Sequence, residues 1–276
     1  MNYVDKNNQI LNEWRSKYHK QDISCDFFAE DGIMFRGEFD HNGANWLRKE
    51  SEDGSKENDL WANAPLRILY LTKDQPSVDD GAWDLREECY HHPNSSIEDY
   101  KLRRQYAFHR NLVFSLYGFY CSIQGKIPLF EDVSSPSLEP EVLRVSDEFP
   151  FARINCKKIV GGSNCPQEEL EKALKNDEKF LKQQINSLDA NLIICCGHQN
   201  GQNAILEMLN RIGYNFPSSP EDDDCYDVYY DEKKQVVAID SYHLSYFGYG
   251  GANHYKDLVQ TWQAFLKKHP GFLPRR

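Results

Sequence analysis

Short runs of apolar residues recur along the chain, each bounded by polar or turn-forming residues. Runs of this length and composition are typical of strands buried inside a sheet. Two of them, 226–230 and 235–240, flank the polar segment 231–234 and predict a hairpin whose second arm lies in the core. The other predicted strands are 67–72, 151–155 and 191–196.

Between these runs, apolar residues recur at intervals of three and four, which places them on one face of a helix. The clearest case is 167–188, where leucine and isoleucine form a continuous stripe. Residues 10–18 show the same amphipathic pattern near the start of the chain. Further helices are predicted over 99–123, 204–212 and 255–266.

The alternation of strands and helices predicts a fold of the α/β class. Parallel strands need a long crossover connection, and a helix usually provides it. We therefore expect a three-layer α/β/α sandwich with a central, mostly parallel sheet of about four strands. Residues 65–276 are expected to form this domain. Residues 1–64, which include the charged and Gly/Ser-bearing stretch 49–58, are expected to form an N-terminal extension packed on the core.

Composition and charge narrow the classes of partner. The 276 residues are 40% hydrophobic and 27% charged, which is typical of a globular protein. The net charge of −11 argues against a protein that grips long nucleic acid without sequence preference, because such proteins need a basic face. Basic residues gather only locally, at 101–104, 157–158 and 275–276, and each cluster is open to interpretation as a phosphate contact or as solvated charge.

Two further features concern location and cofactors. No apolar run approaches the roughly 20 residues of a membrane span, and residues 1–6 lack the layout of a signal peptide. We therefore expect a cytoplasmic protein with no membrane partner. The 8 cysteines include no Cys-x-x-Cys pair. This spacing favours buried thiols over a metal site, so we predict no metal and no other cofactor.

Polar residues follow each predicted core strand. In open α/β sheets, ligands bind beyond the carboxyl ends of the strands. The segments at these ends are Lys73-Asp74-Gln75-Pro76, Asn155-Cys156-Lys157-Lys158, Gly197-His198-Gln199-Asn200 and Asp240-Ser241-Tyr242-His243-Leu244-Ser245-Tyr246. Carboxylate, amide and imidazole groups are therefore expected on one rim of the sheet.

These segments resemble the motifs of the uracil-DNA glycosylase superfamily, in order and in spacing. Thr72-Lys73-Asp74-Gln75-Pro76 is similar to the superfamily's first turn, which ends in Asp-Pro, Asn-Pro or Ala-Pro. Asn155-Cys156-Lys157-Lys158 resembles its strand that ends in Asn, and 180–197 its helix and following strand that ends in Gly. His243-Leu244-Ser245 stands where the superfamily has His-Pro-Ser. The similarity covers about residues 66–268.

The resemblance implies a DNA glycosylase that removes uracil or another altered base during base-excision repair. Such an enzyme extrudes the nucleotide from the stack and reads the base on its Watson–Crick edge. Asn155 would read the base, since an amide offers both a donor and an acceptor. His243 would stabilise the charge that develops on the leaving base, and Asp74 the positively charged sugar. The residues implied for phosphate contacts are Lys73, Lys157 and Ser245.

The chain also departs from the superfamily's pattern. The first turn lacks its Gly, and Leu244 replaces the Pro of His-Pro-Ser. When the prolines are aligned, Gln75 rather than Asp74 takes the catalytic position, and a glutamine cannot carry negative charge. Clustered cysteines like those of the iron–sulfur members have no counterpart, so no cluster is expected. These departures favour an alternative hypothesis, a catalytically inactive module that binds a nucleobase, a nucleotide or nucleic acid.

Other interpretations of single residues stay open from sequence. Asp74 is equally suited to capping a turn, and Asn155 or His243 to satisfying buried polar groups. The pair His91-His92 suits a solvated surface, and Trp83 either packs in the core or stacks on a base. A thiol hydrolase that uses Cys196 with His198 or His243 is a third hypothesis for function.

Overall fold

The computed structural model describes residues 2–34, 39–42, 45–48, 55–75, 84–87, 106–161, 165–220, 226–246 and 248–273. Several predictions from sequence lie outside these ranges. They concern Pro76, Trp83, the pair His91-His92, the basic clusters 101–104 and 275–276, part of the loop 49–58, and residues 99–105 of a predicted helix.

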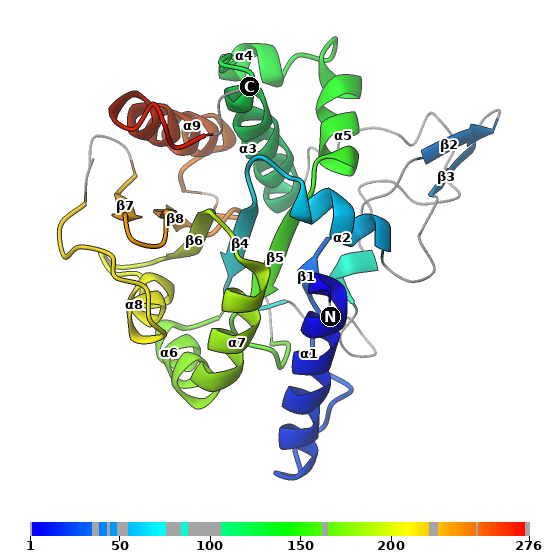
Figure 1. Cartoon of the computed structure of the whole chain (residues 1–276), viewed down its shortest axis with the longest axis vertical. Coiled ribbons are helices and arrows are strands. Elements are labelled where there is room, and N and C mark those ends of the chain that lie inside the picture. The colour runs from blue at the N-terminus through cyan, green and yellow to red at the C-terminus, as the bar shows by residue number, and fades with distance from the viewer. Residues whose placement is uncertain are drawn as a thin grey trace.

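A six-stranded sheet, in the order β1-β5-β4-β6-β8-β7, forms the centre of the described part of the chain (Figure 1). Its four middle strands are parallel to one another, whereas β1 pairs with β5 and β7 with β8 in antiparallel orientation at the two edges. The sheet strands are β1 (Gly32–Ile33), β4 (Ile68–Thr72), β5 (Phe151–Asn155), β6 (Leu192–His198), β7 (Val228–Asp231) and β8 (Val236–Tyr242). A separate hairpin comprises β2 (Phe39–Asn42) and β3 (Asn45–Arg48).

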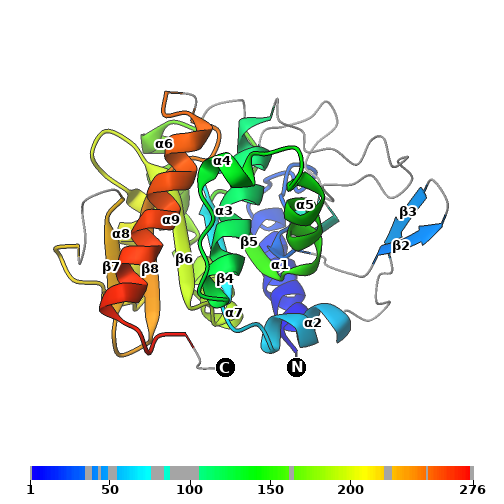
Figure 2. The same cartoon turned by 90° about the horizontal axis from the view of Figure 1, so that it is seen from above.

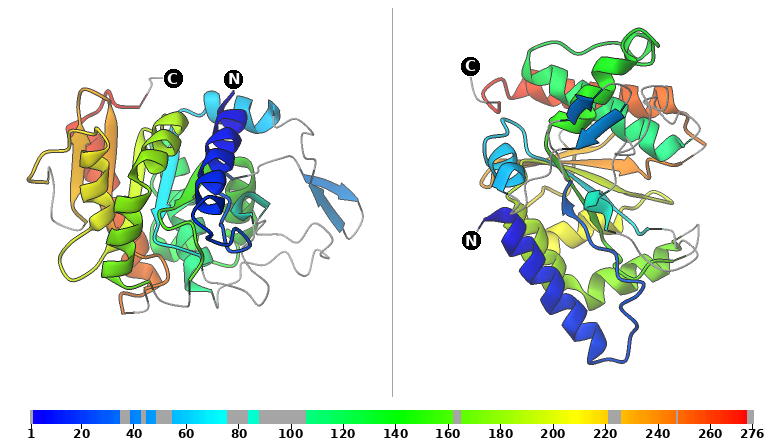
Figure 3. Two further views of the ribbon diagram at one scale, coloured as in Figure 1. Left: turned by 90° about the horizontal axis from the view of Figure 1, so that it is seen from below. Right: turned by 90° about the vertical axis from the view of Figure 1, so that its right-hand side faces the viewer.

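Helices cover both faces of this sheet (Figures 2 and 3). One face carries α1 (Tyr3–His19), α6 (Gln167–Asn176), α7 (Glu178–Leu188) and α8 (Ala204–Arg211). The other carries α3 (Ala107–Ile123), α5 (Glu139–Glu148) and α9 (Gly251–Lys268). The remaining described helices are α2 (Ser55–Ala62), the short α4 (Phe130–Val133) and the 3-10 turn η1 (Leu85–Glu87).

Two hydrophobic cores follow from the pleat of the strands. Alternate residues of a strand point to opposite faces of a sheet. On β6, Ile193 and Cys195 join the core under α1 and α6 to α8, whereas Ile194 and Cys196 join the core under α3 and α9. Every residue of β4 and β5 is buried, which explains why β4 is an almost entirely apolar run in the sequence, whereas β5 also buries the polar residues Arg153 and Asn155.

The α/β class predicted from sequence is confirmed, but the sheet is larger than predicted. It has six strands within the described ranges instead of about four, because an antiparallel strand is added at each edge. β1 comes from the N-terminal segment and pairs Gly32 with Arg153 and Ile33 with Ala152. The same segment packs α1 on α7, where the rings of Trp14 and Phe180 stack with centroids 5.3 Å apart.

The helix predicted over 167–188 is two helices, divided at Asp177. The Asp177 side chain is buried and accepts hydrogen bonds from Lys17 Nζ, at 2.8 Å, and from the Tyr18 hydroxyl. This contact with α1 fixes Asp177 at the junction of α6 and α7. Apolar periodicity runs through the break and therefore does not reveal it. Across the described residues, no helix has the length and apolar character required to cross a bilayer.

Candidate active site

A cavity of about 500 Å³ lies at the carboxyl ends of three parallel strands, β4, β6 and β8. This is where ligands bind in open α/β sheets. Four residues predicted for the site line it, namely Lys73, Asp74, His243 and Ser245. The cavity is also lined by Cys165, His198, Gln199, Asn200, Tyr242 and Tyr246.

The loops after β4 and β5 run side by side and bring Asp74 to Lys157. The backbone N–H of Lys157 donates to the carbonyl of Lys73 at 2.9 Å, and the N–H of Gly161 to the carbonyl of Gln75 at 3.2 Å. A Cβ atom on Gly161 would lie 2.7 Å from Lys157 Nζ and 2.8 Å from Asp74 Oδ2. The glycine therefore leaves the space in which the two charged groups meet.

Asp74, which lines the cavity, forms an ion pair with Lys157, which does not line it, with 3.4 Å between Oδ2 and Nζ. Lys157 also contacts Glu169 Oε1 at 2.7 Å. Burial raises the pKa of Asp74, and the nearby Lys157 opposes that rise. Burial works to lower the pKa of Lys157, but Glu169 and Asp74 together raise it. The cation predicted to hold a phosphate is thus engaged by two carboxylates.

Lys73, the other lysine predicted for phosphate contact, donates from Nζ to Gln199 Oε1 at 2.8 Å. Burial lowers the pKa of this lysine. The contact joins the loop after β4 to the end of β6 across the cavity. A ligand phosphate would have to compete with the Gln199 oxygen for the ammonium group.

His243 is held as a neutral imidazole of one tautomer. Its Nδ1 lies 2.7 Å from the Ser245 hydroxyl oxygen and accepts from the Ser245 backbone N–H at 3.4 Å. Because the N–H can only donate, Nδ1 is an acceptor and the ring proton lies on Nε2. Burial, followed by the charges of Arg153 and Lys73, lowers the pKa of His243 to about 3. His243 therefore presents an N–H donor without carrying a charge at neutral pH.

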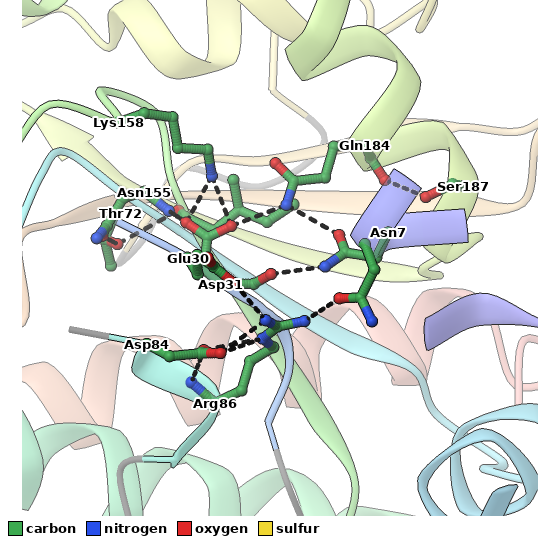
Figure 4. A network of polar contacts seen from close by, with 12 residues as sticks. Asn7, Glu30, Asp31, Thr72, Asp84, Arg86, Asn155, Lys158, Gln184 and Ser187 are labelled. Atoms are coloured by element: carbon green, nitrogen blue, oxygen red, sulfur yellow. Dashed lines mark hydrogen bonds and ion pairs between the residues drawn. The ribbon is translucent and has the colours of Figure 1, made fainter. Parts of the chain in front are cut away.

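Asn155 and Gln75 are fully buried and are not among the residues that line the cavity. Asn155 Oδ1 accepts from the Thr72 hydroxyl at 2.5 Å, and its backbone N–H donates to Asp31 Oδ2 at 2.8 Å (Figure 4). In the part of the chain that the structure describes, Asn155 Nδ2 and both amide atoms of Gln75 have no hydrogen-bond partner. The amide of Asn155, predicted to read the base, and that of Gln75, predicted for the catalytic position, are thus unsatisfied but do not line the cavity.

A second imidazole, His198, was considered from sequence only as a strand-end residue and as a partner of Cys196, and was given no role in the glycosylase hypothesis. Its Nδ1 lies 3.0 Å from Asp240 Oδ2, and Asp240 Oδ1 accepts from Asn203 Nδ2 at 2.6 Å. The sequence places His198 and Asp240 at the ends of two strands, which is the signal that could have found them. The contact itself depends on an irregularity of β6 between Cys195 and His198, which sets His198 level with Tyr242.

Three comparisons, with protein-family models, with curated proteins and with solved structures, found no match to the chain. Among the described residues, no group of three or more His, Cys, Asp or Glu side chains is arranged to hold a metal ion. Burial raises the pKa of Cys196 to about 12, so this thiol is unsuited to act as the nucleophile of the thiol hydrolase considered above.

Proposed function

We propose that the protein is a hydrolase that cleaves the N-glycosidic bond of uracil or another altered base in DNA. The observation that carries this proposal is the neutral imidazole of His243, with its proton on Nε2, in the same cavity as the Asp74 carboxylate. N-glycosidic cleavage develops negative charge on the base and positive charge on the sugar. A neutral N–H donor and a carboxylate are the two groups that such a transition state requires.

The cavity also has the size and the aromatic wall that a flipped base needs. About 500 Å³ lies within the range of small-ligand sites. The rings of Tyr242 and Tyr246 lie against each other with centroids 5.0 Å apart, and both line the cavity. A base that enters would stack on an aromatic face, a contact that tolerates any base.

The experiment that tests this function is base release from oligonucleotides. Single- and double-stranded DNA carrying uracil, hypoxanthine or xanthine would be incubated with the protein, and abasic sites revealed by alkali. We expect strand breaks that His243→Ala and Asp74→Asn abolish. His19→Ala, a change of an exposed histidine at the end of α1, serves as the matched control and should cleave like the unaltered protein.

A second candidate function is a module that binds a nucleobase-containing ligand without cutting it. It is favoured by the contacts of the charged groups, because Asp74 is paired with Lys157, and Lys73 with Gln199. Gln75, which takes the superfamily's catalytic position, cannot serve as a charged group there. Under this alternative, none of the oligonucleotides is cut, and His243→Ala weakens binding of a uracil-containing strand by the folded protein.

A further inference from the structure

His198, Asp240 and Asn203 form a chain of hydrogen bonds that ends at the cavity. Asp240 is nearly buried, and its two carboxylate oxygens are used by different partners, Oδ2 by His198 and Oδ1 by Asn203. The Asn203 amide also donates to the backbone carbonyl of Cys195 at 2.8 Å, and its oxygen caps α8 by accepting from the N–H of Ile205. The carboxylate is thus fixed by β6, β8 and the first turn of α8.

This chain of contacts sets the tautomer of His198. A carboxylate oxygen accepts hydrogen bonds, so in the neutral ring Nδ1 carries the proton toward Asp240 and Nε2 keeps its lone pair. Within the described ranges, no hydrogen bond to Nε2 of His198 is found. The side chain lines the cavity and is 25% exposed. His198 therefore presents a proton acceptor to a ligand or a water molecule.

The two imidazoles of the cavity are therefore in opposite tautomers. His243 presents Nε2–H as a donor, because Ser245 donates to its Nδ1. His198 presents Nε2 as an acceptor, because Asp240 accepts from its Nδ1. One imidazole therefore presents a donor and the other an acceptor to the same cavity. An enzyme that uses one acid and one base needs two such groups.

The other candidates for a base are less suited to take a proton. Asp74 is held in an ion pair with Lys157, so its Oδ2 already accepts a hydrogen bond from the Lys157 ammonium. Gln75 has no basic atom and does not line the cavity. Water also has space beside His198, because a second cavity of about 210 Å³ is lined by His198, Asp240 and Tyr242.

We propose that His198 is a catalytic residue that takes a proton from the attacking water, and that Asp240 is the positioning residue behind it. This inference rests on the function proposed above. The water oxygen forms a bond to the anomeric carbon of the sugar while the bond from that carbon to the base nitrogen breaks. The bonding electron pair leaves with the base, whose oxygen is held by His243 Nε2–H. The proton on His198 then passes through water to the departed base, which gives the free base and a sugar hydroxyl.

The test compares His198→Ala, His198→Gln and Asp240→Asn in the base-release assay with a uracil-containing oligonucleotide. We expect His198→Ala to lower kcat roughly 10²–10⁴-fold, the usual contribution of a general base, and to leave KM within about twofold. Asp240→Asn should lower kcat in the same direction without raising KM, because the amide no longer enforces the tautomer. Asp26→Asn, an exposed carboxylate far along the chain from the cavity residues, is the matched control and should not change kcat.

Chemical rescue separates a proton acceptor from a structural residue. Free imidazole added to His198→Ala should restore part of the base release and should have no effect on the unaltered protein. A His198→Ala protein that retains kcat within threefold, or that loses activity only through KM, would overturn the assignment of His198 alone. A folded, unaltered protein that releases no base from any oligonucleotide would overturn the proposed function and this inference with it.

Discussion

Two neighbouring lysines on the loop after β5 have opposite surroundings. Lys158 is 0% exposed and places Nζ 2.5 and 2.6 Å from the two oxygens of Asp31, which is also 0% exposed. Lys157 and its partner Asp74 have side chains that are 11% and 10% exposed, and their charged atoms are 3.4 Å apart. One pair lies in the interior, and the other includes Asp74, which lines the cavity.

The buried pair is fully satisfied by its neighbours. Asp31 also accepts from Gln184 Nε2 at 2.8 Å and from the backbone N–H of Asn155 (Figure 4). The Lys158 ammonium lies 5.1 Å from the ring centroid of Trp14. The backbone carbonyl of Asp31 accepts from Asn7 Nδ2 at 2.7 Å. These contacts join α1, β1, β5 and α7, and they place the backbone of Asn155 behind the cavity.

The difference separates an architectural ion pair from one that a ligand can reach. A buried pair loses its hydration on folding, and its attraction offsets that loss only when every group has a partner. Asp74 lines the cavity and keeps some contact with water, so hydration offsets part of the loss when its partner is removed. The two lysines should therefore respond very differently to removal of charge.

The largest expected effect is that of Lys158→Met. We predict a loss of about 3–5 kcal/mol in the free energy of unfolding, because Asp31 would be left buried without a countercharge. Lys157→Met, the matched change one residue earlier, should cost less, about 1–3 kcal/mol, because Asp74 lines the cavity and water there can partly replace its lost partner. Urea unfolding of the two variants measures the contrast. Equal losses of unfolding free energy would contradict the contrast between the buried Asp31–Lys158 pair and the Asp74–Lys157 pair.

The next effect concerns the link between Asn203 and Asp240. Asn203→Ala removes the N-cap of α8 and the donor to a buried carboxylate oxygen, so we predict a loss of about 2 kcal/mol or more. The control is Asn2→Ala, which removes only a cap, that of α1, and should cost about 1 kcal/mol. Thermal unfolding gives both values, and identical losses would mean that the bond to Asp240 adds nothing.

The core strands and part of the cavity can be predicted from sequence for physical reasons. Strands buried on both faces are mostly apolar, so β4 is visible as a run, and β5 as a shorter one that contains Arg153 and ends in Asn155. The polar residues that follow parallel strands must meet at one edge of the sheet. This rule placed Lys73, Asp74, His243 and Ser245 together, and all of them line the cavity.

The features that sequence did not reveal depend on long-range pairing. Asp31 and Lys158 are 127 residues apart, and nothing local indicates which of two adjacent lysines is buried. β1 has only two residues and no periodicity. The contact between His198 and Asp240 needs the irregularity of β6, which uninterrupted alternation does not predict. The predicted role of Asn155 in reading a base and that of Gln75 at the catalytic position remain predictions.

A smaller effect is expected from the pH dependence of stability. The pKa of His243 is about 3 in the folded protein and near 6.5 when unfolded, so the unfolded chain binds more protons between these values. Stability is therefore fully present above about pH 6.5 and is lost as the pH falls toward 3. This histidine contributes at most about 1.4 kcal/mol per pH unit.

His243→Gln should reduce the slope of unfolding free energy against pH, measured by urea unfolding between pH 7 and 5. An unchanged slope would contradict the buried, neutral imidazole.

The smallest effect on stability, and a large one on binding, is expected for Tyr246→Ala at the cavity. Tyr246 is 49% exposed, so its loss should change the free energy of unfolding by about 0.5 kcal/mol or less. Stacking of a base on an aromatic ring contributes about 1–3 kcal/mol, which corresponds to a roughly 5- to 150-fold weaker Kd. Fluorescence anisotropy with an oligonucleotide that carries 2′-fluoro-2′-deoxyuridine, an analogue that resists cleavage, measures this Kd.

Tyr106→Ala is the control. It removes a tyrosine that is 53% exposed and does not line the cavity, so it should leave the Kd unchanged. Equal affinities for the two variants would show that the exposed aromatic wall does not hold the base, and binding would then depend on the imidazoles and Asp74 alone.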